Sequence, residues 1–269
     1  MDHGASRPEQ LRGGVRISAL DGVVRVDLDR PERRNALSDA LLAELEATFT
    51  QLRGETAARC VVLGSTDPKT FSAGGDLDGF AAERTQLEKY EDMRRLPAVF
   101  EAIGSLGKPV ICAVDGHCLA GALGLALACD LIVASDRASF GTPEIKVGLF
   151  PFMIGALLSR SVPIKKAIEM MLLGERIDAR EGERLGFVNK VVPAAELEAR
   201  VAEWAGRLAA SPPGVMRVAK DALAAQRDVP LAAALEMMRS QLALTQESEE
   251  AREGILAFKE KREPAWPSA

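Results

Sequence analysis

The chain has 269 residues, of which 47% are hydrophobic and 27% charged, and its formal net charge is −5. This composition is typical of a folded globular protein and argues against bulk disorder. The mild acidity argues against a surface that coats nucleic acid or an anionic membrane, so neither is expected as a partner. With only two histidines, His3 and His117, the chain cannot build a multi-histidine metal site, and we expect no metal.

The N-terminal residues 1–14 are polar, lack the apolar core of a signal peptide, and are expected to form a flexible lead-in. The most apolar stretches, 122–134 and 147–158, are too short to span a bilayer. No C-x-x-C pair occurs, and each cysteine lies in or beside an apolar run, which predicts buried free thiols and a reduced, cytoplasmic protein. The four cysteines are Cys60, Cys112, Cys118 and Cys129.

A β-hairpin opens the expected fold. Val24, Val26 and Leu28 alternate with charged residues, as in a half-buried strand, and Asp21-Gly22 separates this strand from the run 15–20. A helix is expected next, with Ser38 as its N-cap, because apolar residues then recur at helical spacing. These residues are Leu37, Leu41, Leu45, Phe49 and Leu52.

Continuous apolar runs at 60–63, 110–114 and 131–134 predict strands that are buried on both faces, and helices are expected between them at 83–103 and 120–128. This alternation indicates an α/β fold with parallel crossovers. The later part of the chain reads as nearly all helical. One of its helices carries an apolar stripe made of Leu231, Leu235, Met238 and Leu242.

Two glycine-bearing segments offer backbone amides to a ligand. Phe71–Leu77 follows a predicted strand and places Ala73 and two glycines at a turn, where small side chains let a ligand approach the main chain. In Val114–Gly124 a strand leads into a helix, and Gly121 at its start offers unpaired amides at the positive end of the helix dipole, which suits a developing oxyanion. Each segment alone also fits an ordinary loop or a close helix contact.

A third segment, Phe140–Gly148, places Glu144 directly after Pro143 in an otherwise apolar stretch. Alone, this carboxylate also fits a solvated residue in the first turn of a helix. The three segments in this order, with strands ahead of them, are much more specific than any one of them.

Together they resemble the crotonase family, also called the enoyl-CoA hydratase/isomerases, and the resemblance extends from about Val15 to Trp266. It implies a spiral of ββα units over residues 15–195 and a helical trimerisation region over 196–269. It also implies an acyl-CoA thioester substrate with no separate cofactor, and a homotrimer or homohexamer. The resemblance rests on Arg30-Pro31, Asn35–Leu37, Phe71–Leu77, Ala113–Asp130, Phe140–Glu144 and Glu253–Ile255, with Phe258, Lys261 and Arg262.

The resemblance assigns two oxyanion-hole amides, those of Ala73 and Gly121, which would polarise the thioester carbonyl and stabilise the enolate formed when a C2 proton leaves. Glu144 is the implied acid and base. The backbone of residues 73–76, which are Ala73, Gly74, Gly75 and Asp76, is implied to line the coenzyme A pocket, although Asp76 could equally cap the turn.

Basic residues near the implied phosphate entrance are Arg30, Arg33 and Arg34, with solvated surface charge as the alternative. Lys259 and Lys261 are further candidates, toward the coenzyme A of a neighbouring subunit. We interpret His117 as structural.

The sequence departs from the hydratase pattern at Gly124, where hydratases of this family carry a first glutamate. Because hydration conventionally uses two carboxylates, a lone Glu144 favours Δ3–Δ2 enoyl-CoA isomerisation, and apolar neighbours are expected to raise its pKa. Three alternatives stay open. They are hydration of a fatty or branched 2-enoyl-CoA with Asp78 or Glu175 as the second carboxylate, decarboxylation of a malonyl-type thioester, and CoA-thioester binding without catalysis.

Two other enzyme classes fit poorly. A serine hydrolase would need His117 to pair with an exposed serine, and the chain has no G-x-S-x-G elbow. A nicotinamide dehydrogenase would need a G-x-G-x-x-G turn after the first strand, which is also missing. The acyl pocket is expected between 83–103 and 150–157, where Phe152 and Met153 suggest a remodelled wall, with ordinary packing as an equally good explanation.

Overall fold

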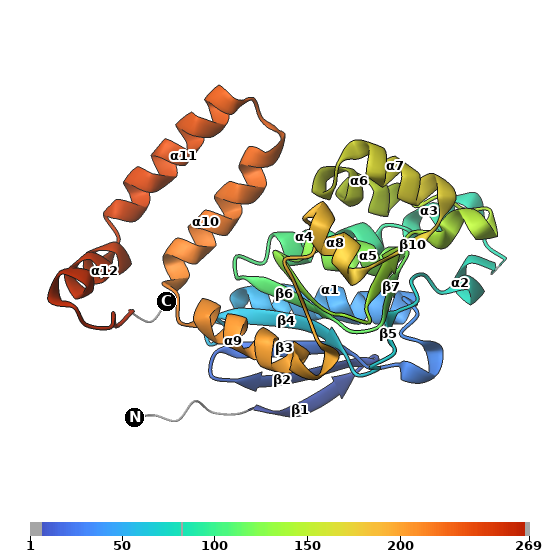
Figure 1. The fold of residues 1–269 in the computed structure, drawn as a ribbon, viewed down its shortest axis with the longest axis horizontal. Helices are drawn as coiled ribbons and strands as arrows, with labels where there is room; N and C mark the ends of the chain where they lie inside the picture. The colour runs from blue at the N-terminus through green and yellow to red at the C-terminus, as the bar shows by residue number, and fades with distance from the viewer. Residues whose placement is uncertain (1–6, 82, 267–269) are drawn as a thin grey trace.

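Two β-sheets and the helices around them form the body of the protein (Figure 1). The computed structural model describes residues 7–81 and 83–266. The larger sheet has seven strands in the order β1-β2-β3-β4-β6-β8-β11. Their bounds are Arg7–Arg12, Val15–Leu20, Val23–Leu28, Cys60–Ser65, Val110–Val114, Leu131–Ser135 and Lys190–Val192. The smaller sheet has the order β10-β9-β7-β5, with bounds Arg176–Asp178, Ser139–Gly141, His117–Leu119 and Thr70–Ser72.

The helices of the body are α1 (Asp39–Gly54), α2 (Leu77–Ala81), α3 (Gln86–Asp92), α4 (Arg95–Gly104), α5 (Gly121–Ala128), α6 (Phe152–Ser161), α7 (Ile164–Leu173), α8 (Ala179–Leu185) and α9 (Leu197–Ala209). Short 3-10 turns occur at η1 (Pro31–Arg33), η2 (Pro143–Val147) and η3 (Ala194–Glu196). The C-terminal helices are α10 (Pro213–Ala225), α11 (Leu231–Gln246) and α12 (Glu249–Glu260), with η4 (Gln226–Asp228) between the first two.

The chain passes repeatedly from the larger sheet to the smaller one and then into helical structure. β4 is followed by β5, β6 by β7 and then α5, and β8 by β9 and then η2. β5, β7 and β9 pair in parallel, so their carboxyl ends meet at one edge of the smaller sheet. The three glycine- and glutamate-bearing segments follow these strands, so they meet at this edge. In α/β folds, ligands bind outside the carboxyl ends of parallel strands.

The predicted elements that depend on strong local patterns are confirmed. The hairpin β2–β3 turns through Asp21 and Gly22, both with positive φ, and Ser38 Oγ accepts the amide of Leu41 at 3.3 Å at the start of α1. The three apolar runs form the buried parallel strands β4, β6 and β8. All four cysteines are buried free thiols, and burial raises the pKa of Cys60 to about 12.

The expectation of a flexible lead-in over residues 1–14 is wrong for Arg7–Arg12, which form β1, while residues 1–6 lie outside the described part. β1 pairs antiparallel with β2 at the edge of the larger sheet. An edge strand can be held by its backbone hydrogen bonds alone, so it needs no apolar alternation, and the polar sequence of β1 gives no periodic pattern to detect.

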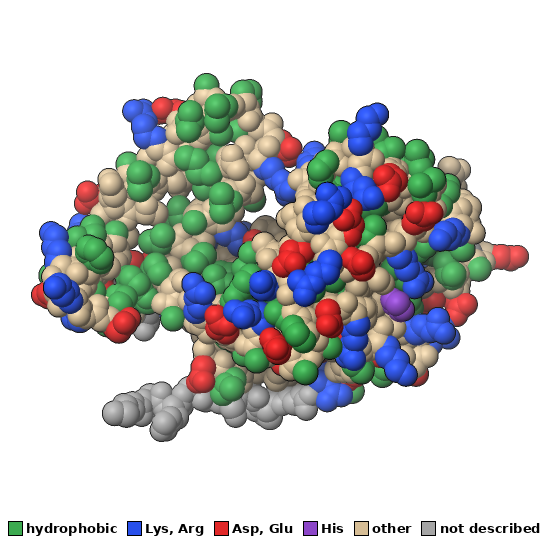
Figure 2. Space-filling view, in the orientation of Figure 1, with side chains coloured by type: hydrophobic (Ala, Val, Ile, Leu, Met, Phe, Trp, Pro, Cys, Tyr) green, Lys and Arg blue, Asp and Glu red, His purple; other side chains and the backbone are tan. Residues whose placement is uncertain are grey.

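The C-terminal helices form an arm that stands away from the body (Figures 1 and 2). α10 and α11 run side by side, and α12 returns toward the start of α10, where the Glu250 carboxylate accepts the amides of Gly214 and Val215 at 2.8 and 2.7 Å. The apolar stripe expected on α11 is largely exposed, and only Ala234 of that helix is buried. The exposed members are Leu231, Leu235 and Leu242.

Lys220 fastens this arm to the body. Its side chain is 8% exposed, and Nζ donates to the carbonyls of Ile103 and Lys108 and to Asp130 Oδ2 at 3.1, 2.8 and 2.8 Å. Asp130 Oδ2 also accepts the amide of Val110 at the start of β6. Through Asp130 the arm is thus tied to the start of a central strand.

We expect Lys220→Met to lower the free energy of unfolding by about 2–3 kcal/mol, because it leaves the Asp130 carboxylate without its cation. The loss falls below the full cost of a broken buried pair because the Asp130 side chain is 37% exposed and water can partly solvate it. Chemical denaturation would measure the change. Lys166→Met, which removes a surface lysine that pairs with Glu169 and lies near Glu181, is the control and should cost less than about 1 kcal/mol; equal losses would contradict the anchoring role.

Candidate active site

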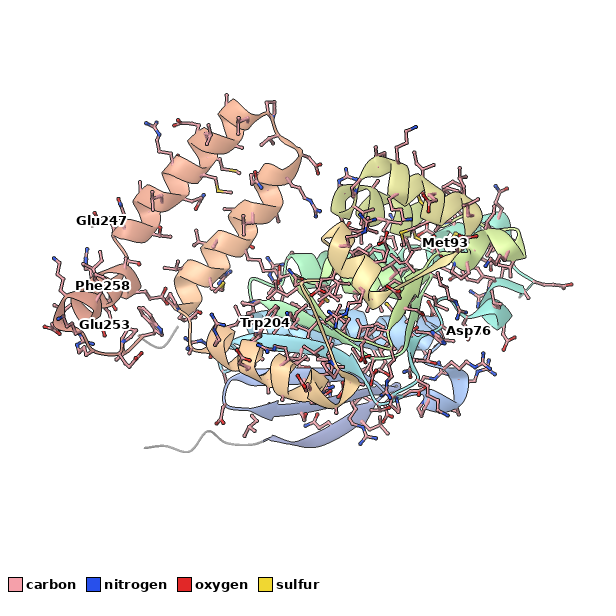
Figure 3. All side chains as sticks on the ribbon, viewed as in Figure 1. Asp76, Met93, Trp204, Glu247, Glu253 and Phe258 are labelled. Carbon is pink, nitrogen blue, oxygen red and sulfur yellow. The ribbon has the colours of Figure 1, made fainter. Side chains whose placement is uncertain are left out.

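A cavity of about 1250 Å³ opens at the edge where β5, β7 and β9 end. All three candidate segments contribute to its wall, through Ala73, Gly75 and Asp76, through Ala120 and Gly121, and through Pro143 and Glu144. The remainder of the wall comes from η1, α2, α3, α4 and the start of α6. In Figure 3, two of the wall residues, Asp76 and Met93, lie on the side of the body opposite the arm.

Glu144 places a partly buried carboxylate in this wall. It follows Pro143 in η2, whose fixed φ suits the first position of a helical turn, and its backbone carbonyl accepts the amide of Leu149 at 3.0 Å. Within the part of the chain that the structure describes, its Oε2 atom is buried and has no hydrogen-bond partner. Burial raises the pKa of the Glu144 carboxyl above its ordinary value. A carboxylate in this state is suited to accept a proton.

This pKa shift predicts opposite pH effects on activity and stability. The unprotonated base becomes more abundant as pH rises, so proton removal by Glu144 should increase along a limb centred above the usual glutamate range. The folded state holds this proton more tightly than the unfolded state does. Its stabilising contribution is therefore complete below the unfolded pKa and is lost as pH rises through the folded pKa.

Glu144→Gln should consequently gain melting temperature relative to the unsubstituted protein as pH rises from about 5 to about 8. Calorimetry across that range measures the difference. A melting-temperature gap that stays constant with pH would mean that the carboxyl has an ordinary pKa.

Gly121 is the first residue of α5, so its amide has no acceptor inside the helix. The preceding residue, Ala120, has φ 53° and ψ −129°, a backbone conformation that residues with a Cβ rarely adopt. Its own amide donates to the Gly141 carbonyl at 2.8 Å, which ties the start of α5 to the end of β9. The turn that aims the Gly121 amide is therefore strained and held by its neighbours, a feature that the sequence did not show.

The expectation of a free amide at Ala73 is not met. Its N–H donates to the carbonyl oxygen of Arg34 at 3.0 Å, although the residue does line the cavity. Residues 34–37 run beside 73–76 and exchange further backbone hydrogen bonds, from Leu37 to Gly74 and from Asp76 to Leu37. This pairing joins segments that are about 40 residues apart, which is why the sequence gave no indication of it.

Asn35 holds that pairing in place. Its side chain is fully buried, accepts the amide of Arg30, and donates to Ser65 Oγ and to the Phe71 carbonyl at 2.8 and 3.0 Å. The Asn35 carbonyl in turn accepts the hydroxyl of Ser72 at 2.7 Å. The Asn35–Leu37 motif thus acts by positioning β5 and the residues that follow it.

Gly74 packs directly against the strained turn. Its φ is +93°, and a Cβ built on it would lie 2.4 Å from Ala120 Cβ and 2.8 Å from the Leu119 carbonyl oxygen. Only glycine fits this contact without displacing the neighbouring backbone. Gly75 lines the cavity, whereas Gly74 does not and instead packs against the turn at Ala120.

The rim of the cavity carries charges that are partly paired with one another. Arg33 lies 3.9 Å from Asp76 and forms a closer ion pair with Asp78 on α2. Asp76 both lines the cavity and caps the turn, since its Oδ1 accepts the amide of Asp78 at 3.2 Å. Arg34 also lines the cavity, but Arg30 does not: it packs over Gly14 and donates to Ser38 Oγ. Two of the three arginines therefore remain candidates for phosphate contact.

The other charged candidates lie at the rim of the cavity or outside its wall. Glu175 is outside the cavity wall, and the Asp78 side chain is 79% exposed at the rim. Lys259 and Lys261 belong to the arm, and Phe258 in the same helix lies far from Asp76 in Figure 3. A carboxylate residue that the sequence did not indicate is Glu101 of α4, which also lines the cavity.

Gly124 is buried one turn beyond Gly121, and neither it nor Phe100 of α4 lines the cavity. A Cβ on Gly124 would lie 2.3 Å from Cζ of Phe100, so the aromatic ring fills the space in front of this glycine.

The histidine expected to be structural contacts a serine. His117 Nδ1 lies 2.8 Å from Ser139 Oγ across β7 and β9, and burial lowers the pKa of the imidazole. Neither residue lines the cavity, so this pair lacks the oxyanion site that a serine hydrolase needs. Among the described residues, no group of three or more His, Cys, Asp or Glu side chains is placed to hold a metal ion. Over the same residues, no helix is both long and apolar enough to cross a membrane.

The expected apolar wall is present, but it is more open than the sequence suggested. Phe150 and Phe152 contact each other with tilted rings whose centroids lie 4.9 Å apart, and Phe152 is 78% exposed. Large apolar side chains that both line the cavity and remain exposed are Leu77, Phe80, Tyr90, Met93, Val147, Leu149 and Phe152.

The fold and the cavity define an α/β enzyme with its site at the carboxyl ends of short parallel strands. A family model described as enoyl-CoA hydratase/isomerase matches residues 18–269. A putative enoyl-CoA hydratase of Thermus thermophilus is 35% identical, with 91% of this chain and 97% of that protein covered. The 2,3-dehydroadipyl-CoA hydratase of Escherichia coli is also 35% identical, with coverages of 92% and 96%.

A solved structure, that of human enoyl coenzyme A hydratase domain-containing protein 3, superposes with a TM-score of 0.90 at 32% identity, covering 97% of this chain and all of that one. The chain therefore belongs to the enoyl-CoA hydratase/isomerase family, the crotonase family that the sequence resembles, and it has the fold of that family.

Proposed function

We propose that this protein is a Δ3–Δ2 enoyl-CoA isomerase in which Glu144 is the single acid and base. The observation that carries the proposal is the buried, unpartnered Oε2 atom of Glu144, in the same cavity wall as the amide of Gly121. The position of the family's other glutamate holds Gly124, which faces an aromatic ring.

In the proposed reaction the amide of Gly121 donates to the thioester oxygen of a 3-enoyl-CoA. Glu144 removes a proton from C2, the double bond shifts, and the same carboxyl returns the proton to C4. Negative charge on the thioester oxygen between these steps is stabilised by the Gly121 amide and the positive end of α5. Ala73 is the proposed second donor; its N–H would be shared between the Arg34 carbonyl and the substrate oxygen, as in other three-centre hydrogen bonds.

The substrate is proposed to bind with its acyl chain along the exposed apolar wall and its phosphates near Arg33 and Arg34. Recognition of a phosphate by Arg33 would require its ion pair with Asp78 to open. The steps use only side chains and backbone groups of this chain, and coenzyme A is part of the substrate.

Matched 2-enoyl-CoA and 3-enoyl-CoA substrates, each incubated with the protein in deuterated water, test the proposal. Interconversion of the two enoyl thioesters without added water supports isomerisation, and deuterium at C4 of the product from the 3-enoyl substrate reports exchange of the Glu144 proton with solvent during the transfer. Formation of 3-hydroxyacyl-CoA as the main product from the 2-enoyl substrate would overturn it in favour of hydration.

Hydration is the second candidate because Glu101 lines the same cavity and could act as the second carboxylate. In that case Glu101→Gln should abolish 3-hydroxyacyl-CoA formation. For the isomerase, the same substitution should leave the rate within about threefold, since an exposed side chain that does not touch the migrating proton contributes little to the barrier.

We also propose that the protein is a homotrimer or homohexamer assembled through the arm. The support is the row of exposed leucines on α11 together with Phe258 on α12, which is 85% exposed. A cytoplasmic location is proposed on the basis of the four buried free thiols.

A further inference from the structure

Helices α4 and α5 pack through large residues on α4 that face glycines on α5. Leu96 Cδ2 lies 3.3 Å from the place where a Cβ on Gly121 would be, and Phe100 Cζ lies 2.3 Å from the corresponding place at Gly124. Leu96 and Phe100 are four residues apart and share one face of α4, while the two glycines are three residues apart and share one face of α5. The two pairs form consecutive contacts along a single helix–helix seam.

The first contact of this seam is at the cavity and the second is behind it. Leu96 and Gly121 line the cavity, whereas Phe100 and Gly124 do not. Phe100 is 9% exposed and belongs to the main hydrophobic core, and Gly124 is buried beneath its ring. The ring therefore fills the space directly behind the part of the cavity wall that carries the amide proposed to hold the substrate oxygen.

We propose that Phe100 is a specificity-determining residue that keeps water away from C3 of the bound acyl chain and so commits the enzyme to isomerisation. This inference rests on the proposed function. The role proposed for Phe100 goes beyond the lack of a carboxylate at position 124. A glycine at that position would by itself leave a polar or water-filled space. Here the space is filled by an apolar ring, which a water molecule cannot occupy or hydrogen-bond to.

The distinction matters because Glu144 could take up a proton in either reaction, although hydration conventionally uses a second carboxylate as well. In isomerisation, Glu144 takes a proton from C2 and returns it to C4. In hydration, Glu144 would take a proton from water, the resulting hydroxyl would form a bond to C3 of the 2-enoyl thioester, and the proton would pass to C2. Only the second reaction needs a water molecule beside C3, so the ring decides between them by occupying space.

The test is the ratio of 3-hydroxyacyl-CoA to isomerised product formed from 3-enoyl-CoA. Phe100→Leu removes the Cζ and Cε atoms that face Gly124 but keeps an apolar side chain in the core, and Phe100→Ala opens the space further. We expect the ratio to rise by about tenfold or more in Phe100→Ala, and by less in Phe100→Leu. Phe49→Leu, at a fully buried phenylalanine on α1 outside the cavity wall, is the matched control and should leave the ratio unchanged.

An unchanged ratio in folded Phe100→Leu and Phe100→Ala would overturn the inference while leaving isomerisation intact. Failure of the proposed function looks different: the unsubstituted protein would then either not interconvert the two enoyl thioesters or form 3-hydroxyacyl-CoA as its main product. If Phe100→Ala does not fold, Phe100→Leu alone decides, because a raised ratio supports the inference and an unchanged one contradicts it.

The contact itself can be tested separately by thermal denaturation. Gly124→Ala should lower the melting temperature in the unsubstituted protein, where the new methyl group meets the Phe100 ring, and should lower it much less in the Phe100→Leu background. Equal effects in both backgrounds would show that the ring does not occupy the space in front of Gly124.

Discussion

Replacing Glu144 with glutamine is expected to lower kcat for enoyl-CoA isomerisation by about 10³-fold, within the range of about 10²–10⁴ that general acid–base catalysis contributes. Glutamine has the shape of glutamate but cannot accept a proton. Because the Oε2 position of Glu144 has no hydrogen-bond partner among the described residues, the substitution disrupts no hydrogen bond at that atom. The loss should therefore appear in kcat and in deuterium exchange at C2, with acyl-CoA affinity within about threefold of the original.

Glu175→Gln is the matched control, since Glu175 carries the same side chain close to the small sheet but outside the cavity wall. It should leave the rate unchanged. Isomerisation that survives Glu144→Gln would contradict the proposed role of this carboxyl. Loss of acyl-CoA binding together with the rate would instead point to a binding role for Glu144.

Replacing Gly74 with alanine is expected to lower kcat by about 10²–10³-fold, as much as the loss of one oxyanion donor. The new methyl group would lie 2.4 Å from Ala120 Cβ, so the turn that orients the Gly121 amide must move. A stability loss of about 2–3 kcal/mol should accompany this, because alanine is also disfavoured at φ +93°. Steady-state kinetics and chemical denaturation on the same preparation measure both effects.

A substitution at Gly186 distinguishes the clash with Ala120 from the strain of a positive φ. Its φ is +90°, nearly that of Gly74, but a Cβ there would meet nothing within 4 Å. Gly186→Ala should therefore cost about 1 kcal/mol of stability and leave kcat unchanged. If Gly74→Ala behaved in the same way, the contact with Ala120 would not be positioning the amide.

The sequence predicted those parts of the fold that depend on local pattern. Ser38 caps α1 as expected, and the apolar runs form buried parallel strands. The strands of the smaller sheet have three residues each, which is too few to show a period, so the sequence does not predict them as strands. Yet these short strands bring the three candidate segments to one cavity, so recognising the segments did not reveal how they meet.

Most of the candidate residues lie in one cavity wall, and the features that the sequence did not indicate share one cause. Glu144 and Gly121 lie in the cavity wall, as do Ala73, Gly75, Asp76 and Arg33. The occupied amide of Ala73 and the ring of Phe100 against Gly124 both depend on contacts between distant segments. No local sequence pattern indicates such contacts, because the residues next to each partner in the sequence give no sign of the distant segment that it meets.

The leucines of α11 show a local pattern that was predicted correctly but did not reveal its surroundings. Their spacing correctly indicated an amphipathic helix, but in a single chain that face is exposed. Periodicity shows that a helix has an apolar side, and it does not show which surface covers that side.

The way the arm closes on itself determines how it can move. The carboxylate of Glu250 holds the first amides of α10, Trp266 donates to the Ala210 carbonyl at 2.6 Å, and Lys220 anchors the middle of α10. Both ends of the three-helix loop thus return to one joint, where Pro212 and Pro213 restrict rotation. The arm is therefore held in one arrangement before it meets another surface, and docking its leucines there would cost little conformational entropy.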